Sequence, residues 1–236
     1  MKYTLIAMMM GLAGVATAGQ KLVPVAPATA PAPAPAWGVE LAGTYGWGLG
    51  KYMKSEAITK KNHMNQVGGD ITGVYNLDEN NAVTLRFGYT YGGDKFGMTY
   101  EPEANELYDI NSHIKERLHT FTLMPGYRYT VALDDKWSVY GGVNVGVAAV
   151  SSKLEVTHHV DRRSDLTASA HKSAWGFAWS VEAGARYAVT ETVDVFAAVS
   201  YTGNTARPNI KYDGVSVGRV RTQQTLGVRA GVGIKF

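Results

Sequence analysis

The segment TLGVRAGVGIKF, residues 225–236, alternates apolar side chains with small, charged or polar ones. Its apolar positions are Leu226, Val228, Ala230, Val232, Ile234 and Phe236. A period of two describes a β-strand whose faces differ, with one face in an oily environment and the other in a polar one. The segment therefore predicts a strand that crosses a membrane.

The first residues predict which membrane this is. Residues 1–18 contain Lys2, an apolar run over 5–16, and the small residues Ala16-Thr17-Ala18 as a cleavage motif, which is the layout of a secretory signal peptide. The apolar run is shorter than the roughly 20 residues that a membrane-spanning helix needs, and no later segment is long and apolar enough. Secretion combined with membrane strands predicts the bacterial outer membrane.

Composition agrees with this interpretation. The chain has 14 Tyr, 5 Trp and 27 Gly residues, and aromatic side chains are typical of membrane interfaces. The absence of cysteine excludes disulfides and thiol chemistry. The net charge of +3 is too small and too scattered to predict a nucleic-acid partner.

Residues 19–36 are rich in Ala and Pro and favour an extended polyproline II conformation, so we expect a periplasmic segment before a barrel over 37–236. A plain spacer is one interpretation of this segment. Contact with the cell wall or with another envelope protein is the other.

Eight alternating segments follow the Ala/Pro-rich stretch. They cover approximately 37–49, 67–77, 83–91, 120–129, 137–147, 175–189, 193–201 and 225–236. Short turns are expected near 78–81, 131–136 and 190–192, and long loops over 50–66, 92–118, 151–173 and 203–221. Such a plan predicts an all-β, eight-stranded antiparallel up-and-down transmembrane barrel with both termini periplasmic. Pro125 forfeits one ladder hydrogen bond, so a bulge or weak point is expected there.

At this level the chain resembles the small outer-membrane barrels typified by the OmpA transmembrane domain and OmpX. In that family a terminal aromatic residue after alternating apolar residues is read by the barrel-assembly machinery. The matching residues here are Ala230, Val232, Ile234 and Phe236. Because the chain stops at its last strand, we expect no peptidoglycan-binding domain of the kind found in full-length OmpA.

The interior of an eight-stranded barrel is only wide enough for its own side chains. Seven inward positions carry charge: Glu40, Asp70, Arg86, Arg128, Glu182, Arg186 and Arg229. Strand positions put Glu40, Arg86, Arg128 and Arg186 at a lower level, and Asp70, Glu182 and Arg229 at a higher one. Val74, Tyr140 and Phe196 also face inward near the lower end. Because buried charges need partners, we expect a closed ionic network; the alternative is a narrow gated ion path.

The loops give a weak enzymatic signal. His158, His159 and His171 share the third loop with Ser152, Ser164 and Ser169, and some eight-stranded barrels that modify lipid A use such residue types. No spacing fixes a serine, a base and a carboxylate, and adjacent histidines on an extended segment point apart, so no catalytic residue, metal or cofactor is predicted.

Charge is segregated between the first two loops. The first carries Lys51, Lys54, Lys60 and Lys61 against Glu56, and the second is acidic. Basic loops can hold the phosphates of lipopolysaccharide. The apolar residues of the second loop are expected to extend the strands above the membrane or to form a recognition surface.

The sequence as a whole predicts a non-enzymatic, monomeric outer-membrane barrel for envelope integrity and surface display, whose loops bind a ligand or host surface. The expected partners are outer-membrane lipids, lipopolysaccharide and the barrel-assembly machinery, with no nucleic acid. A narrow gated pore and a lipid A-modifying enzyme at the rim are the alternatives.

Overall fold

The computed structural model describes residues 37–49, 53–54, 64–100, 110–160, 166–212, 215–220 and 223–236. The expected signal peptide over 1–18 and the Ala/Pro-rich segment over 19–36 lie outside this part of the chain, and both remain predictions.

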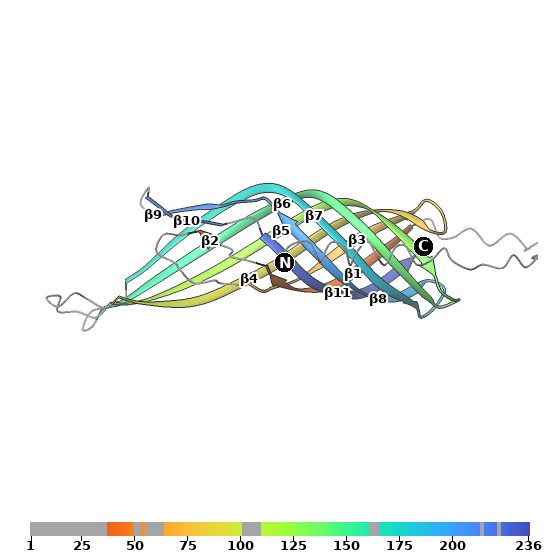
Figure 1. Ribbon diagram of the computed structural model, residues 1–236, viewed down its shortest axis with the longest axis horizontal. Helices are drawn as coiled ribbons and strands as arrows, with labels where there is room; N and C mark the ends of the chain where they lie inside the picture. Colours follow the sequence, from red (N-terminus) through yellow and green to blue (C-terminus); the bar gives the residue numbers. More distant parts are fainter. Residues whose placement is uncertain are drawn as a thin grey trace, which may run out of the picture. The chain divides into compact units, whose positions relative to one another are not determined.

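The described residues form eleven strands. These are β1 (Trp37–Gly48), β2 (Met53–Lys54), β3 (Gln66–Asn76), β4 (Asn81–Tyr100), β5 (Ile110–Ala132), β6 (Trp137–Val160), β7 (Leu166–Ala188), β8 (Val193–Asn204), β9 (Asn209–Tyr212), β10 (Val215–Val220) and β11 (Gln223–Lys235). Eight of them close a barrel in the order β1-β11-β8-β7-β6-β5-β4-β3 (Figure 1). Every neighbouring pair is antiparallel, so the predicted fold is confirmed. In the described residues, no helix is long and apolar enough to cross a membrane.

The first and last barrel strands pair along their whole length. The β1–β11 ladder runs from Gly38 opposite Lys235 to Gly48 opposite Thr225, and the Phe236 N–H donates to the Trp37 carbonyl. Gly231 lies against the backbone of β1, where a Cβ atom would clash with the Leu41 carbonyl. The seam therefore leaves no open strand edge in lipid.

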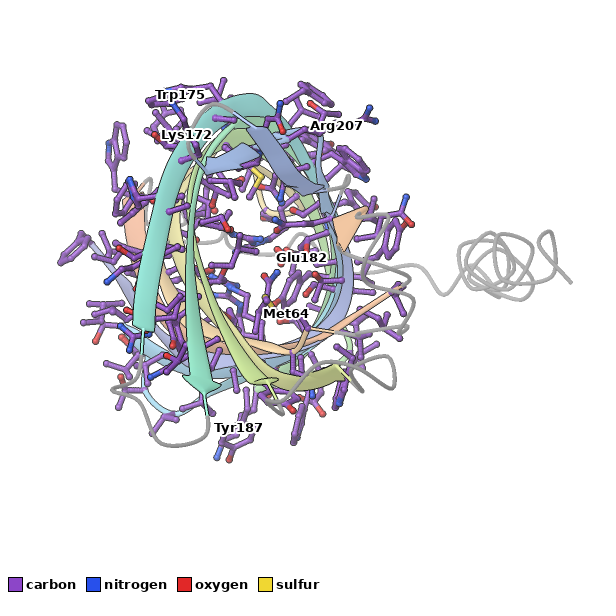
Figure 2. All side chains as sticks on the ribbon, turned by 90° about the vertical axis from the view of Figure 1, so that its left-hand side faces the viewer. Met64, Lys172, Trp175, Glu182, Tyr187 and Arg207 are labelled. Carbon is purple, nitrogen blue, oxygen red and sulfur yellow. The ribbon has the colours of Figure 1, made fainter. Side chains whose placement is uncertain are left out.

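The two faces of the barrel wall alternate as predicted. On β1, Leu41 is 61% exposed and the preceding Glu40 only 1%. Trp37 and Trp47 mark the two ends of the outward apolar face of this strand. Their ten-residue separation, at about 3.3 Å per residue and about 40° of tilt, spans about 25 Å of bilayer. Figure 2 shows Trp175 and Tyr187 projecting outward and Glu182 lying inside.

The three short turns share one hydrogen-bonding arrangement; they lie at 77–80, 133–136 and 189–192. Asp78 accepts hydrogen bonds from the backbone N–H groups two and three residues ahead, and Asp134 and Thr190 do the same in their own turns. Each turn thus satisfies two backbone donors through one side-chain oxygen. The expected turns lie where the sequence placed them, to within a few residues.

Two of the expected long loops are much shorter than predicted. Strands β4 to β7 extend past the membrane section, so only residues 101–109 separate β4 from β5, and only 161–165 separate β6 from β7 (Figure 1). The predicted bounds of 92–118 and 151–173 are wrong because backbone pairing continues beyond the point where the outward apolar alternation ends. The expectation that the second loop extends the strands is confirmed for β4 and β5.

The sequence did not predict the small sheet β2-β10-β9, which is formed by segments of the first and fourth loops. Its strands are two to six residues long. They are too short for alternation to mark them.

The bulge expected at Pro125 is absent. Leu123 pairs with Val147 and Gly126 with Asn144, so the β5–β6 register is the same on both sides of the proline. Pairing is interrupted at Met124 and Pro125 alone, because proline lacks a backbone donor. The site is a local weak point without an inserted residue.

Candidate functional site in the barrel interior

A layer of charged side chains fills the middle of the barrel. We name it the ionic layer; its members are Glu40, Asp70, Arg86, Arg128, Glu182, Arg186, Asp194 and Arg229. Seven different strands contribute them, so the layer ties the wall together across its diameter. All seven charged residues predicted from alternation lie in this layer and take part in its ion pairs.

Glu40 is the centre of the layer. Its carboxylate pairs with the guanidinium groups of Arg128 and Arg186, and its Oε2 lies 2.9 Å from Arg128 Nη2. Arg229 Nη2 approaches the same oxygen at 3.3 Å. Three guanidinium groups from three strands therefore converge on one buried carboxylate.

A second carboxylate, Asp70, holds Arg229 in a bidentate pair. Arg229 Nε donates to Asp70 Oδ2 at 2.9 Å, and Nη2 donates to Oδ1 at 2.6 Å. The Thr72 hydroxyl accepts from Arg229 at 3.1 Å and donates to Asp70 at 3.1 Å. Such forked, charge-assisted geometry fixes orientation as well as supplying energy.

The predicted division into two levels is wrong for Arg86. This residue was expected beside Glu40, but its Nη2 pairs with Glu182 at 2.6 Å and its Nε lies 3.8 Å from Asp70. Arg229, expected higher, reaches Glu40. Strand tilt shifts each strand relative to the next, so counting residues from the rim does not give a common height.

Asp194 is a further member of the layer that was not among the seven predicted residues. Its carboxylate accepts a hydrogen bond from Arg186 Nη1 at 2.9 Å and lies 3.5 Å from Lys235 Nζ. Lys235 lies at the end of the barrel that carries the short turns, called the turn end below. Asp194 lies two residues before the inward Phe196 on β8 and so has the same inward parity, which was the available signal. With Asp194 included, four carboxylates face four guanidinium groups, so the layer is neutral without any external ion.

Aromatic rings complete the layer. Arg128 lies with its Cζ 4.8 Å from the Tyr140 ring centroid, and Arg229 lies 4.6 Å from that of Phe196. Arg186 contacts both rings. These are cation–π contacts between buried groups. Tyr140 and Phe196, together with Val74, face inward as predicted.

A second layer, made of apolar side chains, lies toward the loop end. We name it the apolar layer; it contains Met64, Leu118, Met124, Ala148, Val150, Ala178 and Ala206. Met64 and Ala206 belong to non-strand segments that enter the barrel, and Figure 2 shows Met64 inside the wall. Both residues lie in segments that the sequence predicts as loops, and the sequence does not predict this layer. The inward parity of Leu118 and Val150 was the only signal for it.

Two cavities flank the ionic layer. One of about 110 Å³ lies between the two layers and is lined by Asp70, Arg86 and Arg229 together with Met124 and Ala178. The other, of about 190 Å³, lies at the turn end and is lined by side chains including Glu40, Arg128 and Arg186. No residue lines both cavities, so the ionic layer separates them.

The family model of the outer membrane protein beta-barrel domain matches residues 22–222. The chain belongs to this family. It is a bacterial outer-membrane barrel, and both the predicted resemblance and the predicted membrane are confirmed.

Solved structures with a similar arrangement include other outer-membrane barrels. Ail of Yersinia pestis is 14% identical with a TM-score of 0.42, over 84% of this chain and 98% of Ail. OprG of Pseudomonas aeruginosa is 14% identical with a TM-score of 0.44, over 86% and 97%. The outer membrane protein W of E. coli is 15% identical with a TM-score of 0.35, over 86% and 99%. A search of curated proteins gives no match.

The expected assembly residues lie on the outer face of this barrel at the seam. Val232, Ile234 and Phe236 are exposed there, in alternation with inward Gly233, and Ala230 continues the same row. Phe236 caps the row beside Trp37. This geometry leaves the terminal aromatic side chain accessible from outside the wall.

The rim residues considered for catalysis are only partly brought together. His171 Nε2 lies 2.7 Å from the hydroxyl of Ser151, which had not been singled out, whereas Ser152 is buried and Ser169 exposed. The side chains of His158 and His159, and all of Ser164, lie outside the described residues. Within the described part, no cluster of His, Asp or Glu could hold a metal.

Proposed function

We propose that the protein is a non-enzymatic barrel that supports envelope integrity and presents its loops at the cell surface. The observation that supports this best is the double closure of the interior, once by the neutral ionic layer and once by the apolar layer. A lumen filled by its own side chains leaves the wall and the loops as the working surfaces. We also propose that the barrel is monomeric, because the β1–β11 seam completes it within one chain.

The orientation that we propose puts both termini and the short turns in the periplasm and the extended ends of β4 to β7 outside the cell. The end of β11 lies beside the 189–192 turn, since Lys235 N–H donates to the Thr192 carbonyl. The assembly machinery would then read Phe236 from the periplasmic side.

Because the chain contains no cysteine, the orientation can be tested with single introduced thiols. Arg207→Cys, at the exposed loop end, should react with an impermeant maleimide on intact cells. Glu79→Cys, in the first turn, should react only after the outer membrane is permeabilised. The reverse pattern would contradict the orientation.

A narrow gated pore is the second candidate, and a specific observation favours it. Because cavities already lie on both sides of the ionic layer, rearrangement of that layer would lengthen a water-accessible path. Purified protein in a planar bilayer distinguishes the candidates: the closed barrel should show no steady current. Stable, large currents from the wild type would contradict our proposal.

The rim-enzyme alternative has the least support. In the described part of the chain, no carboxylate bonds to the Ser151–His171 pair, because Glu155 is engaged by Lys153 and Arg117. Incubation of purified protein with lipopolysaccharide, followed by mass spectrometry of the lipid, should show no change in mass. A released acyl chain would contradict the proposal.

A further inference from the structure

The outer surface of β5, β6 and β7 changes sharply from apolar to polar beyond one row of paired residues. Phe121, Ala149 and Trp175 lie opposite one another on these strands and form the last apolar row. Trp175 is 76% exposed. This row marks the edge of the membrane's hydrocarbon at the loop end.

Two rows beyond this edge lies an unusual set of side chains. Arg117 of β5 pairs directly with Lys153 of β6, and Lys153 pairs with His171 of β7. We name these three residues the basic row. Like charges directly opposite each other on neighbouring strands destabilise a sheet unless another charge compensates them. The row is therefore unfavourable in isolation and becomes favourable beside an anion.

The protein supplies only part of that compensation. Glu155 is the one carboxylate on this described surface; it lies 2.8 Å from Lys153 Nζ and 3.8 Å from Arg117 Nη2. The hydrogen bond from Lys153, helped by the charges of Arg117 and Lys115, lowers the pKa of Glu155. Arg117, Lys153 and Lys115 thus surround one carboxylate, and positive charge remains.

The spacing of the row fits a broad anionic head group. Three neighbouring strands span about 10 Å, and the four residue steps that separate the two rows on each strand place the bases about 13 Å along the strand beyond the last apolar row. Long basic side chains can reach back toward the membrane surface from there, and a guanidinium group binds phosphate through two parallel hydrogen bonds. A lipid with several phosphates on a wide sugar head group matches this geometry better than one with a single phosphate.

We propose that the basic row binds the phosphates of lipopolysaccharide in the outer leaflet, with its acyl chains against Phe121, Ala149 and Trp175. The sequence favours the lysines of the first loop for this role, but their side chains lie outside the described residues. The basic row provides a site on the barrel wall itself, beyond the last apolar row. The inference rests on the proposed orientation, in which this end of the barrel faces outward.

Lipid retention by purified protein tests the inference. Wild type and Arg117→Gln/Lys153→Gln are folded in detergent, checked by heat-modifiable migration, mixed with lipid A, and examined by native mass spectrometry. The double variant should retain at least about tenfold less lipid A, since each basic residue near a lipid surface contributes about 1 kcal/mol. The control Lys136→Gln/Lys172→Gln removes the same charge from a turn and from the opposite face of β7, and should behave as wild type.

A second measurement requires no variant. Wild type should retain less lipid when enzymatically dephosphorylated lipid A is supplied in place of native lipid A. The decrease should be similar to the one expected for the double variant. The proposal would be overturned if wild type retained both forms of lipid A equally. It would also be overturned if the double variant retained as much lipid A as wild type, or if wild type retained phosphatidylglycerol as well as lipid A. Displacement of lipid A by millimolar inorganic phosphate would also overturn it, because the row would then be a site for a soluble anion. These experiments use detergent-folded protein, so an inverted orientation in cells would leave their result unchanged.

Discussion

The ionic layer and the apolar layer close the same barrel by different physics. In the ionic layer each guanidinium group needs a named carboxylate, and Glu40 alone serves Arg128, Arg186 and Arg229. In the apolar layer Leu118 and Val150 need only neighbours that fill space. Loss of one charge therefore leaves unpaired partners, whereas loss of one methyl group leaves only a small void.

The comparison explains why the two layers occupy different positions. The ionic layer is built from strand residues alone, whose spacing the barrel fixes. The apolar layer accepts Met64 and Ala206 from non-strand segments, because non-directional contacts tolerate less regular backbone. Strand positions in the rigid wall therefore suit directional ion pairs, and the loop end of the barrel suits apolar packing.

The largest expected effect is that of Glu40→Ala. It leaves three buried guanidinium groups short of a carboxylate, and breaking such buried pairs costs about 3–5 kcal/mol. Urea unfolding of protein folded in lipid or detergent measures the loss. Glu40→Gln keeps most of the volume and should lose most of the same free energy. If both variants unfold at the wild-type urea concentration, the charges are hydrated and the interior is an aqueous passage.

A second prediction compares the inner and outer faces of β7 beside the ionic layer. The barrel tolerates Arg186 inside because carboxylates meet it, but Val181→Arg would put the same group into lipid without a partner, at a cost of about 2–4 kcal/mol. The adjacent inward change Ser180→Ala removes one hydrogen bond from Asn144 and should cost about 1 kcal/mol. The same unfolding assay measures both. Equal losses would mean that the two faces are misassigned.

The apolar layer should respond more weakly. Val150→Ala removes two methyl groups from a fully buried site, at about 2 kcal/mol with the void included. Bilayer conductance should remain that of wild type, because the ionic layer still closes the barrel. The control is Val147→Ala on the outward face of the same strand, where lipid replaces the lost contacts. A steady current from Val150→Ala would show that the apolar layer is the tighter closure.

The smallest effect concerns the turns and depends on pH. Hydrogen bonds from the Asn80 N–H and the Trp137 N–H lower the pKa values of Asp78 and Asp134, respectively. Because the folded pKa values lie below the unfolded value of about 3.9, the stabilisation is complete above that pH and is lost as the pH falls through the folded pKa values. The turn at Thr190 has a hydroxyl acceptor and should not respond.

Amide hydrogen-exchange protection factors at Trp137 and Val193, measured between pH 6 and the acid limit of folding, check this difference. Protection at Trp137 should fall in acid while protection at Val193 stays constant. Asp134→Thr should make the second turn resemble the third. Parallel behaviour of both amides in wild type would contradict the role of the carboxylate.

The sequence predicts the membrane section and the turn end well, because lipid outside and charge inside impose strict alternation there. Glu40, Asp70 and Arg229 could be assigned inward for this reason alone. Their pairing could not be predicted, because strand tilt sets relative heights through a register that alternation does not encode. On β4 the outward apolar alternation ends at Tyr91, so it could not indicate that β4 to β7 continue beyond the membrane section. Met64 could not be placed either, since its burial depends on contacts distant in sequence.

The β1–β11 seam has a kinetic consequence. Its first pair, Gly38 and Lys235, joins residues at opposite ends of the barrel sequence, so the contact that completes the cylinder is also the most distant along the chain. Ordering that much chain before the pairing forms is slow, and until then the free sides of both β1 and β11 are unpaired edges. Once formed, the seam cannot fray strand by strand without exposing backbone to lipid. The same feature should therefore give the protein both slow insertion and a long native lifetime.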